Sequence, residues 1–173
     1  MVAPVKFAHV VLKTSRYGEM LEWWCRLLDA KVRHGSDFIS FLSYDDEHHR
    51  LAIVNFPNLE APNQTSAGVE HVAFTFASLD DLFSKYEELS AAGVLPYWTI
   101  NHGMTLSAYY RDPDGNQVEL QVDSMDNQQA DAFMNSPTFA TNPIGIDVDF
   151  PSLITKRKSG VALEELLAYR SDS

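Results

Sequence analysis

The decisive stretch of this sequence is EHVAFTFASLDDLFSKYEELSAAG, residues 70–93. An alternating run typical of a β-strand opens it, and an amphipathic helix pattern follows. Ser78 is a predicted N-cap with Asp81 three residues on as a capping-box-like partner, and Gly93 follows the predicted last turn. Further strands are predicted at residues 94–101, 106–112 and 117–123. The stretch therefore opens a β-α-β-β-β module.

The first half of the chain repeats this pattern. A strand is predicted at residues 6–14, a helix at 17–28, and strands at 30–35, 38–44 and 50–56. His9 and His71 fall at matching places in the two opening strands. We predict an α+β fold in which two βαβββ modules, about residues 5–57 and 68–122, pack as one domain around a central cavity.

The pattern stops after residue 122, and the domain is predicted to span residues 1–123. Short helices are predicted at residues 126–136, 151–160 and 161–170, with a loop over 141–151. The tail, residues 124–173, contains no histidine or cysteine. We therefore predict that it packs on the domain or forms an oligomer interface, and that the protein is a homo-oligomer.

The composition favours a folded, acidic protein. Hydrophobic residues make up 45% of the 173 positions, and the formal net charge is −11. An acidic chain with no basic run is unsuited to nucleic acid or to anionic membranes. No apolar stretch reaches membrane-spanning length, and the N-terminus lacks a signal-peptide pattern. A single cysteine, Cys25, allows no intramolecular disulfide, so a cytoplasmic location is predicted.

Three residues carry the expectation of a metal site: His9, His71 and Glu119. A single strand histidine is more often a core or rim residue, but two at equivalent repeat positions can approach one point. Glu119 interrupts the apolar run VELQV, where a buried carboxylate is costly without a partner. Two imidazoles and one carboxylate form the facial triad typical of non-haem Fe(II), although Zn(II) and Mn(II) accept similar ligands.

These residues lie in the motifs AHVVL around His9, EHVAF around His71, and YYRDPDGNQVELQ, which contains Glu119. In these motifs the chain resembles the vicinal oxygen chelate superfamily over residues 5–122, and within it the single-domain type I extradiol dioxygenases. The resemblance implies Fe(II), with Mn(II) possible, held by the three ligands. It also implies that O2 cleaves a catechol, substituted or 2,3-dihydroxybiphenyl-like, next to its diol.

One substitution favours this subgroup over its relatives. YDDEHHRLAIV aligns with RDPDGNQVELQ without gaps, so Ala52 occupies the place of Glu119 in the first module. Glyoxalase-like enzymes tend to have a fourth protein ligand there. An alanine instead leaves room for a substrate that binds through two oxygens beside O2.

The resemblance also implies roles for further residues. His49, the second residue of the pair in HHRLAI, matches the acid-base residue, although strand alternation counted back from Ala52 favours His48. His102 in the HG-x-T sequence and Tyr109 match residues that hydrogen-bond the catechol. Read singly, His102 is a loop histidine and Tyr109 a core aromatic residue.

Other functions remain open at this stage. One is a glyoxalase-like metal-dependent isomerase, an epimerase or a thiol transferase. Another is a metal-free binder of an aromatic or cationic compound, for which Trp23, Trp24 and Trp98 would be suited. A scaffold without activity is the third. The residues that match the dioxygenases favour the extradiol enzyme over all three.

Overall fold

The computed structural model describes residues 2–60, 63 and 65–170, so residues 61, 62 and 64, between the two predicted modules, lie outside the described residues. The chain forms two compact units. The first comprises Met1–Gly68 and the turn Asp112–Asn116, and the second comprises Val69–Arg111 and Gln117–Ser173. Among the helices described, none has the length and apolar character needed to cross a membrane.

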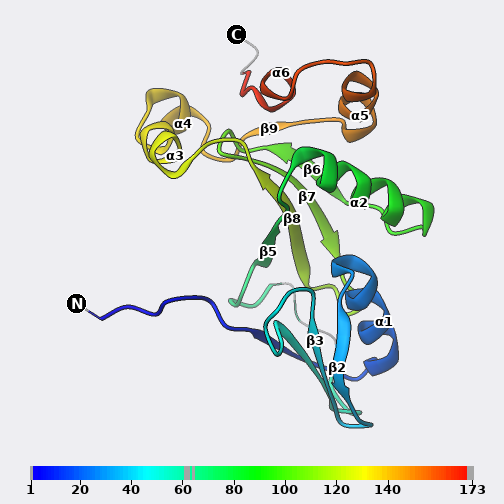
Figure 1. Cartoon of the computed structure of the whole chain (residues 1–173). Helices are drawn as coiled ribbons and strands as arrows, with labels where there is room; N and C mark the ends of the chain where they lie inside the picture. The colour runs from blue at the N-terminus through cyan, green and yellow to red at the C-terminus, as the bar shows by residue number, and fades with distance from the viewer. Residues whose placement is uncertain (1, 61–62, 64, 171–173) are drawn as a thin grey trace. The chain divides into compact units, whose positions relative to one another are not determined.

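The first unit contains a four-stranded sheet with one helix, α1, along it (Figure 1). The strand order is β1-β4-β3-β2, with β1 and β4 parallel and the other pairs antiparallel. The elements are β1 (Val10–Thr14), α1 (Tyr17–Leu28), β2 (Lys31–Gly35), β3 (Ile39–Ser43) and β4 (Leu51–Asn55). Parallel pairing of β1 with β4 requires the crossover that α1 begins.

The second unit repeats this topology, with strand order β5-β8-β7-β6-β9. Its first elements are β5 (His71–Thr75), α2 (Leu79–Ala91), β6 (Trp98–Asn101), β7 (Thr105–Arg111) and β8 (Gln117–Asp123). Val11 pairs with Ala52 in the first sheet, and Ala73 pairs with Glu119 in the second. The α+β fold with two βαβββ modules is therefore confirmed, and Ala52 and Glu119 occupy equivalent ladder positions.

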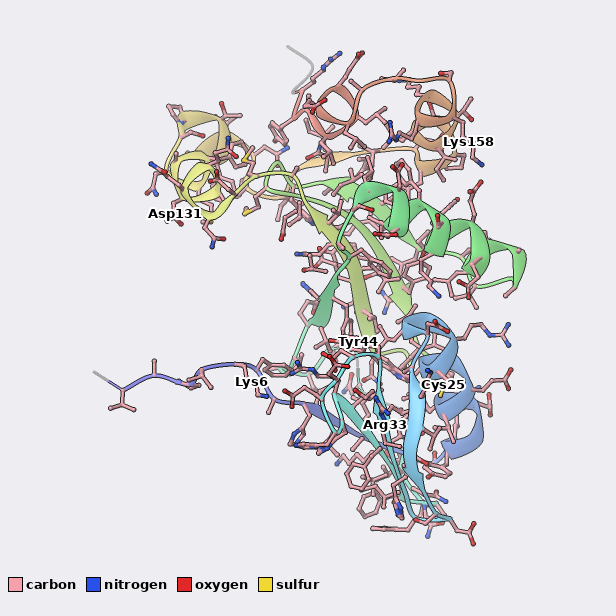
Figure 2. All side chains as sticks on the ribbon, viewed as in Figure 1. Lys6, Cys25, Arg33, Tyr44, Asp131 and Lys158 are labelled. Atoms are coloured by element: carbon pink, nitrogen blue, oxygen red, sulfur yellow. The ribbon has the colours of Figure 1, made fainter. Side chains whose placement is uncertain are left out.

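The two helices form where their sequence signals place them. The hydroxyl of Ser78 accepts a hydrogen bond from the backbone N–H of Asp81 at 3.1 Å, a cap worth about 1 kcal/mol. The Asp81 carboxylate accepts from the Ser78 hydroxyl, not from its backbone. Gly93 has φ of +78°, a value at which glycine avoids the penalty of a Cβ. On α1, Trp24 is fully buried. Cys25, labelled on the same helix in Figure 2, is half-buried, and burial raises the pKa of its thiol.

The first strand is shorter than predicted. It begins at Val10, so His9 lies just before it. The reason is the partner strand: Val10 pairs with Leu51, where β4 itself begins. The preceding backbone is held by the Arg50 guanidinium, which donates to the carbonyls of Phe7 and Ala8 at 3.0 and 3.3 Å.

The tail is more ordered than predicted. Its elements are α3 (Asn127–Met134), α4 (Pro137–Thr141), β9 (Ile146–Asp147), α5 (Phe150–Lys158) and α6 (Leu163–Leu167). The prediction of a loop throughout residues 141–151 is wrong, because β9 pairs antiparallel with β6. Strand β6 would otherwise present the unpaired backbone groups of a sheet edge, and β9 satisfies some of them.

A buried carboxylate organises the turn between β7 and β8. Asp112 is 4% exposed and accepts hydrogen bonds from the backbone N–H groups of Asp114 and Asn116. Its second oxygen accepts from the side chains of Asn116, at 2.8 Å, and Trp24, at 3.2 Å. Burial raises the pKa of Asp112, and these hydrogen bonds oppose that effect.

Replacement of Asp112 is therefore expected to destabilise the protein. Asp112→Ala removes the acceptor for Trp24 and for two N–H groups of the turn, and should lower the free energy of unfolding by about 2–3 kcal/mol. Urea denaturation followed by tryptophan fluorescence measures this. Asp114→Ala is the matched control, with an expected change below about 0.5 kcal/mol. Equal losses in the two variants would contradict the role given to the Asp112 side chain.

Candidate functional site

The second unit contains a buried carboxylate in the middle of its sheet. Glu119 lies on β8, is 4% exposed, and pairs in the ladder with Ala73 on β5 and Tyr109 on β7. Four side chains meet here, and we call them the carboxylate cluster: His71, His102, Tyr109 and Glu119.

Polar contacts of 3.0–3.9 Å connect the carboxylate cluster. Nε2 of His71 lies 3.1 Å from one Glu119 oxygen, and Nε2 of His102 lies 3.9 Å from the other. The same His102 nitrogen lies 3.0 Å from the Tyr109 hydroxyl. The rings of His71 and Tyr109 are perpendicular, with centroids 5.3 Å apart. The next residue, Tyr110, points to the opposite side of the strand and is buried in the core.

Tyr109 is a hydrogen-bond donor in this environment. Burial raises the pKa of its phenol well above the usual range, and the negative charge of Glu119 and a hydrogen bond to it raise that pKa further. The hydroxyl is therefore protonated at neutral pH. It can donate to an anionic oxygen without becoming charged itself.

The geometry of His71 and Glu119 fits a metal ion. A histidine nitrogen and a carboxylate oxygen that bind one metal at right angles lie about 3 Å apart, given metal–ligand distances of about 2.0–2.2 Å. The observed separation is 3.1 Å, which is also a hydrogen-bonding distance. A divalent cation would provide the opposite charge that a buried carboxylate requires.

The first unit contains a group of three histidines, which we call the histidine cluster: His9, His48 and His49. The rings of His9 and His49 have centroids 4.5 Å apart. Nδ1 of His48 lies 2.5 Å from Nδ1 of His49, and the ring of Phe41 packs edge-on against His49 at 4.9 Å. His9 and His48 are exposed, whereas His49 is half-buried.

Of the two adjacent histidines, His49 is the one that lies against both His9 and Phe41. Both precede β4, so strand alternation does not determine their direction. Burial lowers the pKa of His49, and the nearby His48 and His9 rings lower it further. The neutral ring is therefore favoured at neutral pH, with one nitrogen able to accept a proton.

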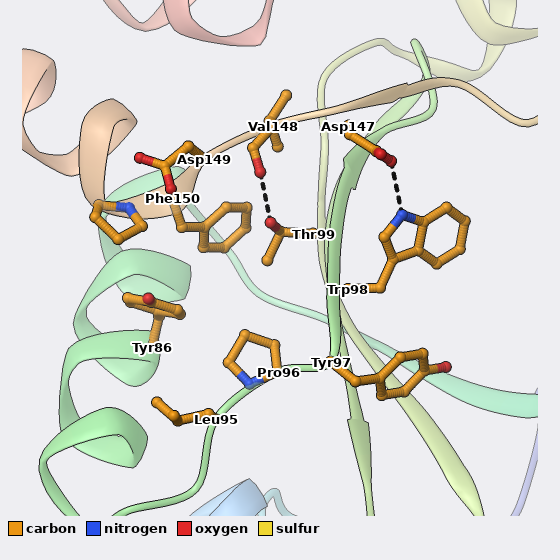
Figure 3. A pocket seen from close by; sticks show the side chains of 11 residues that line it. Tyr86, Leu95, Pro96, Tyr97, Trp98, Thr99, Asp147, Val148, Asp149 and Phe150 are labelled. Atoms are coloured by element: carbon orange, nitrogen blue, oxygen red, sulfur yellow. Dashed lines mark hydrogen bonds between the residues drawn. The ribbon is translucent and has the colours of Figure 1, made fainter.

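The predicted metal ligands are divided between the units, with His9 in the first and His71 and Glu119 in the second. No cluster of three or more His, Cys, Asp or Glu side chains suited to a metal is found among the residues described. A cavity of about 400 Å³ in the second unit is lined by α2, β6 and residues 147–151 (Figure 3). Its lining includes no member of the carboxylate cluster.

Two contacts of the carboxylate cluster have no signal in the sequence motifs. The indole of Trp98 stacks on Tyr109, with centroids 5.0 Å apart and an interplanar angle of 30°. Nδ1 of His102 hydrogen-bonds to the backbone carbonyl of Ile144 in the tail. The contact of Trp98 with Tyr109 follows from the strand register, in which the two residues are paired across β6 and β7. The contact of His102 with Ile144 has no sequence signal, because every residue has a backbone carbonyl.

Comparison with known proteins shows which superfamily has this architecture. The family model described as the Glyoxalase/Bleomycin resistance protein/Dioxygenase superfamily matches residues 6–120. The chain belongs to this superfamily. Its fold agrees with that of a glyoxylase/bleomycin resistance protein/dioxygenase domain from Frankia sp. EAN1pec, with a TM-score of 0.55. That match covers 70% of this chain and 99% of the other at 23% identity, so it concerns the fold alone.

Two relatives in this superfamily are similar over most of the chain. Both are biphenyl-2,3-diol 1,2-dioxygenases of Rhodococcus globerulus. One is 46% identical over 161 residues, which cover 92% of this chain and 84% of the relative. The other is 38% identical over 169 residues, which cover 96% of this chain and 89% of the relative.

Proposed function

We propose that this superfamily member is an Fe(II)-dependent extradiol dioxygenase that opens a catechol ring next to its diol. The observation that carries the proposal is the buried Glu119, with His71 at 3.1 Å and the hydrogen-bonding pair Tyr109 and His102 beside it. The two relatives named biphenyl-2,3-diol 1,2-dioxygenases support this reaction, and a bicyclic catechol is the proposed substrate class.

His9, His71 and Glu119 are the proposed metal ligands. When bound, Fe(II) supplies Lewis acidity toward the diol and a redox connection between the diol and O2. Ala52 supports a triad over a set of four ligands, because its methyl group stands at the ladder position that Glu119 occupies in the other module. Mn(II) could occupy the same ligand set.

The protein's own groups then manage the substrate and its protons. His49, neutral and beside His9, accepts a proton and returns it during ring opening. Tyr109 donates a hydrogen bond to a substrate oxygen as negative charge develops there. His102 orients the diol through Nε2, the nitrogen that faces Tyr109.

Oxygen consumption tests the function directly. Protein reconstituted anaerobically with Fe(II) is mixed with aerobic buffer and a panel of mono- and bicyclic catechols, including biphenyl-2,3-diol. Uptake of one O2 for each yellow ring-fission product formed is the expected result. No uptake with any catechol, despite stoichiometric iron, would overturn the proposal in favour of an isomerase, and protein that binds no metal would favour a small-molecule binder.

Loss of the Glu119 carboxylate should prevent metal binding. Glu119→Gln retains the shape of the side chain but removes its charge, and should weaken Fe(II) binding by at least about 100-fold. Metal content after dialysis, measured by mass spectrometry, reports the change. Gln121→Ala, two residues further along β8 on the same side, is the control and should retain its metal. Wild-type metal content in Glu119→Gln would remove Glu119 from the ligand set.

Loss of the His49 ring should slow turnover with the metal in place. His49→Phe should still bind Fe(II) and catechol, whereas kcat should fall by about 10²–10⁴, the usual cost of a lost acid–base group. His48→Phe is the matched variant at the neighbouring position, with an expected loss below about tenfold. Full activity in His49→Phe, or equal losses in both variants, would contradict the assignment.

A further inference from the structure

Every residue of the segment 98–102 either hydrogen-bonds to the tail or pairs with it in the sheet. The indole of Trp98 donates to Asp147 at 2.7 Å, and the hydroxyl of Thr99 donates to the carbonyl of Val148 at 2.5 Å (Figure 3). The ladder pairs with β9 are Ile100 with Asp147 and Asn101 with Ile146. The Asn101 amide donates to the carbonyls of Leu167 and Ala168 at 3.1 and 3.4 Å, and His102 bonds to Ile144.

Glycines allow the tail backbone and a tail ring to approach His102 closely. Gly145 has φ of +120°, and a Cβ there would lie 2.4 Å from the Asn101 carbonyl oxygen and 2.9 Å from Cα of His102. A Cβ on Gly103 would lie 2.3 Å from the ring of Phe133 on α3. A side chain at Gly145 would require the backbone of the tail to move away from β6, whereas one at Gly103 would displace the Phe133 ring.

The turn that contains Ile144 is closed by one asparagine. Oδ1 of Asn142 accepts from the backbone N–H groups of Ile144 at 3.2 Å and Gly145 at 3.0 Å. Its amide nitrogen donates to the Gly145 carbonyl at 2.6 Å. These three hydrogen bonds determine where the Ile144 carbonyl points. Asn142 is therefore the side chain through which this contact can be altered.

We propose that the Asn142–Gly145 turn is a positioning element, which holds the His102 ring with a proton on Nδ1 and directs Nε2 toward Tyr109 and Glu119. A carbonyl can only accept a hydrogen bond, so the His102 nitrogen that meets Ile144, Nδ1, carries the proton. The other ring nitrogen, Nε2, then lies 3.0 Å from the Tyr109 hydroxyl. For its catalytic consequence the inference rests on the proposed function, in which Nε2 orients the diol.

The first module provides an internal comparison. Its strand β2, equivalent to β6, is the edge of its sheet, and all five of its residues are exposed. His34 on β2 pairs with Phe41 as Trp98 on β6 pairs with Tyr109. A βαβββ module therefore forms its sheet with this strand as an edge. The sheet therefore does not need the tail in order to form, and the effect of the bonds from the tail is to hold the side chains and backbone of β6 in place.

The tautomer itself is the first measurement. Full-length protein with 15N-labelled histidine is loaded with diamagnetic Zn(II), and His102 is assigned by comparison with His102→Gln. At pH 8 the expected spectrum has the proton of His102 on Nδ1, and in Asn142→Ala the proton moves to Nε2 or divides between the nitrogens. A wild-type proton on Nε2 would overturn the proposal, whatever the activity.

Turnover of the Fe(II) enzyme is the second measurement. Asn142→Ala should lower kcat by about 10- to 100-fold, the usual effect of losing a group that orients an active-site residue, with KM changed less than about threefold. Asn142→Asp retains the acceptor for the two N–H groups and should recover most of kcat. Asn135→Ala is the control, since Asn135 makes a similar bond, to the Asp131 carbonyl on α3, away from β6.

The two measurements separate the proposals. Wild-type kcat and tautomer in Asn142→Ala would overturn the positioning role while the dioxygenase function stands. If the wild-type protein opens no catechol ring, the proposed function fails, and the nitrogen that carries the His102 proton still decides whether the tail holds the ring. If Asn142→Ala does not fold, two measurements still test the positioning role: the kcat of Asn142→Asp, and the nitrogen that carries the His102 proton in the wild-type protein.

Discussion

A carboxylate buried in the middle of a β-sheet is the constraint on which this structure depends. An isolated charge in such a place costs several kcal/mol, so it must be compensated by hydrogen bonds, opposite charge or a metal. Around Glu119 stand two histidine rings, at 3.1 and 3.9 Å, and the protonated phenol of Tyr109. None of these groups is a fixed cation, which leaves the carboxylate's charge for a metal to balance.

The two modules have the same fold but different side chains at equivalent positions of their sheets. Glu119 and Tyr109 pair across β8 and β7 where Ala52 and Phe41 pair across β4 and β3. The second module therefore bears the charge and the hydroxyl, while the first presents a methyl group and a phenyl ring. The histidine cluster of the first module lies outside the ladder, in the residues just before β1 and β4.

Much of this fold could be predicted because its signals are local. The helix caps, the strand alternation and the repetition of one pattern predicted the order of elements in both modules, and the ladder register confirms the gapless alignment of Ala52 with Glu119. The start of β1 could not be predicted, since it depends on where β4 begins. For the same reason the alternation that favours His48 over His49 does not apply, because both residues precede β4. Their directions are seen instead in the ring contacts that His49 makes with His9 and Phe41.

The strand β9 and its neighbouring turn were beyond prediction for a different reason. Two residues form β9, too few for a periodic signal, and the contact to His102 is made by a backbone carbonyl that any residue possesses. Only Asn142 and Gly145 mark the place, and such residues are common in turns of every kind. A tail without histidine or cysteine predicts only packing or an oligomer interface, although this one reaches an active-site candidate through its main chain.

A carbonyl is well suited to the task that the tail performs. A carboxylate at Nδ1 would select the same tautomer, but its charge would also stabilise the doubly protonated ring, which has no lone pair on Nε2. It would add a second negative charge near Glu119 as well, in a region where one is already costly. The Ile144 carbonyl orients the ring as a neutral acceptor and directs Nε2 toward Tyr109. A carbonyl thus orients the His102 ring without favouring its doubly protonated form, whereas an Asp or Glu side chain at the same place would do both.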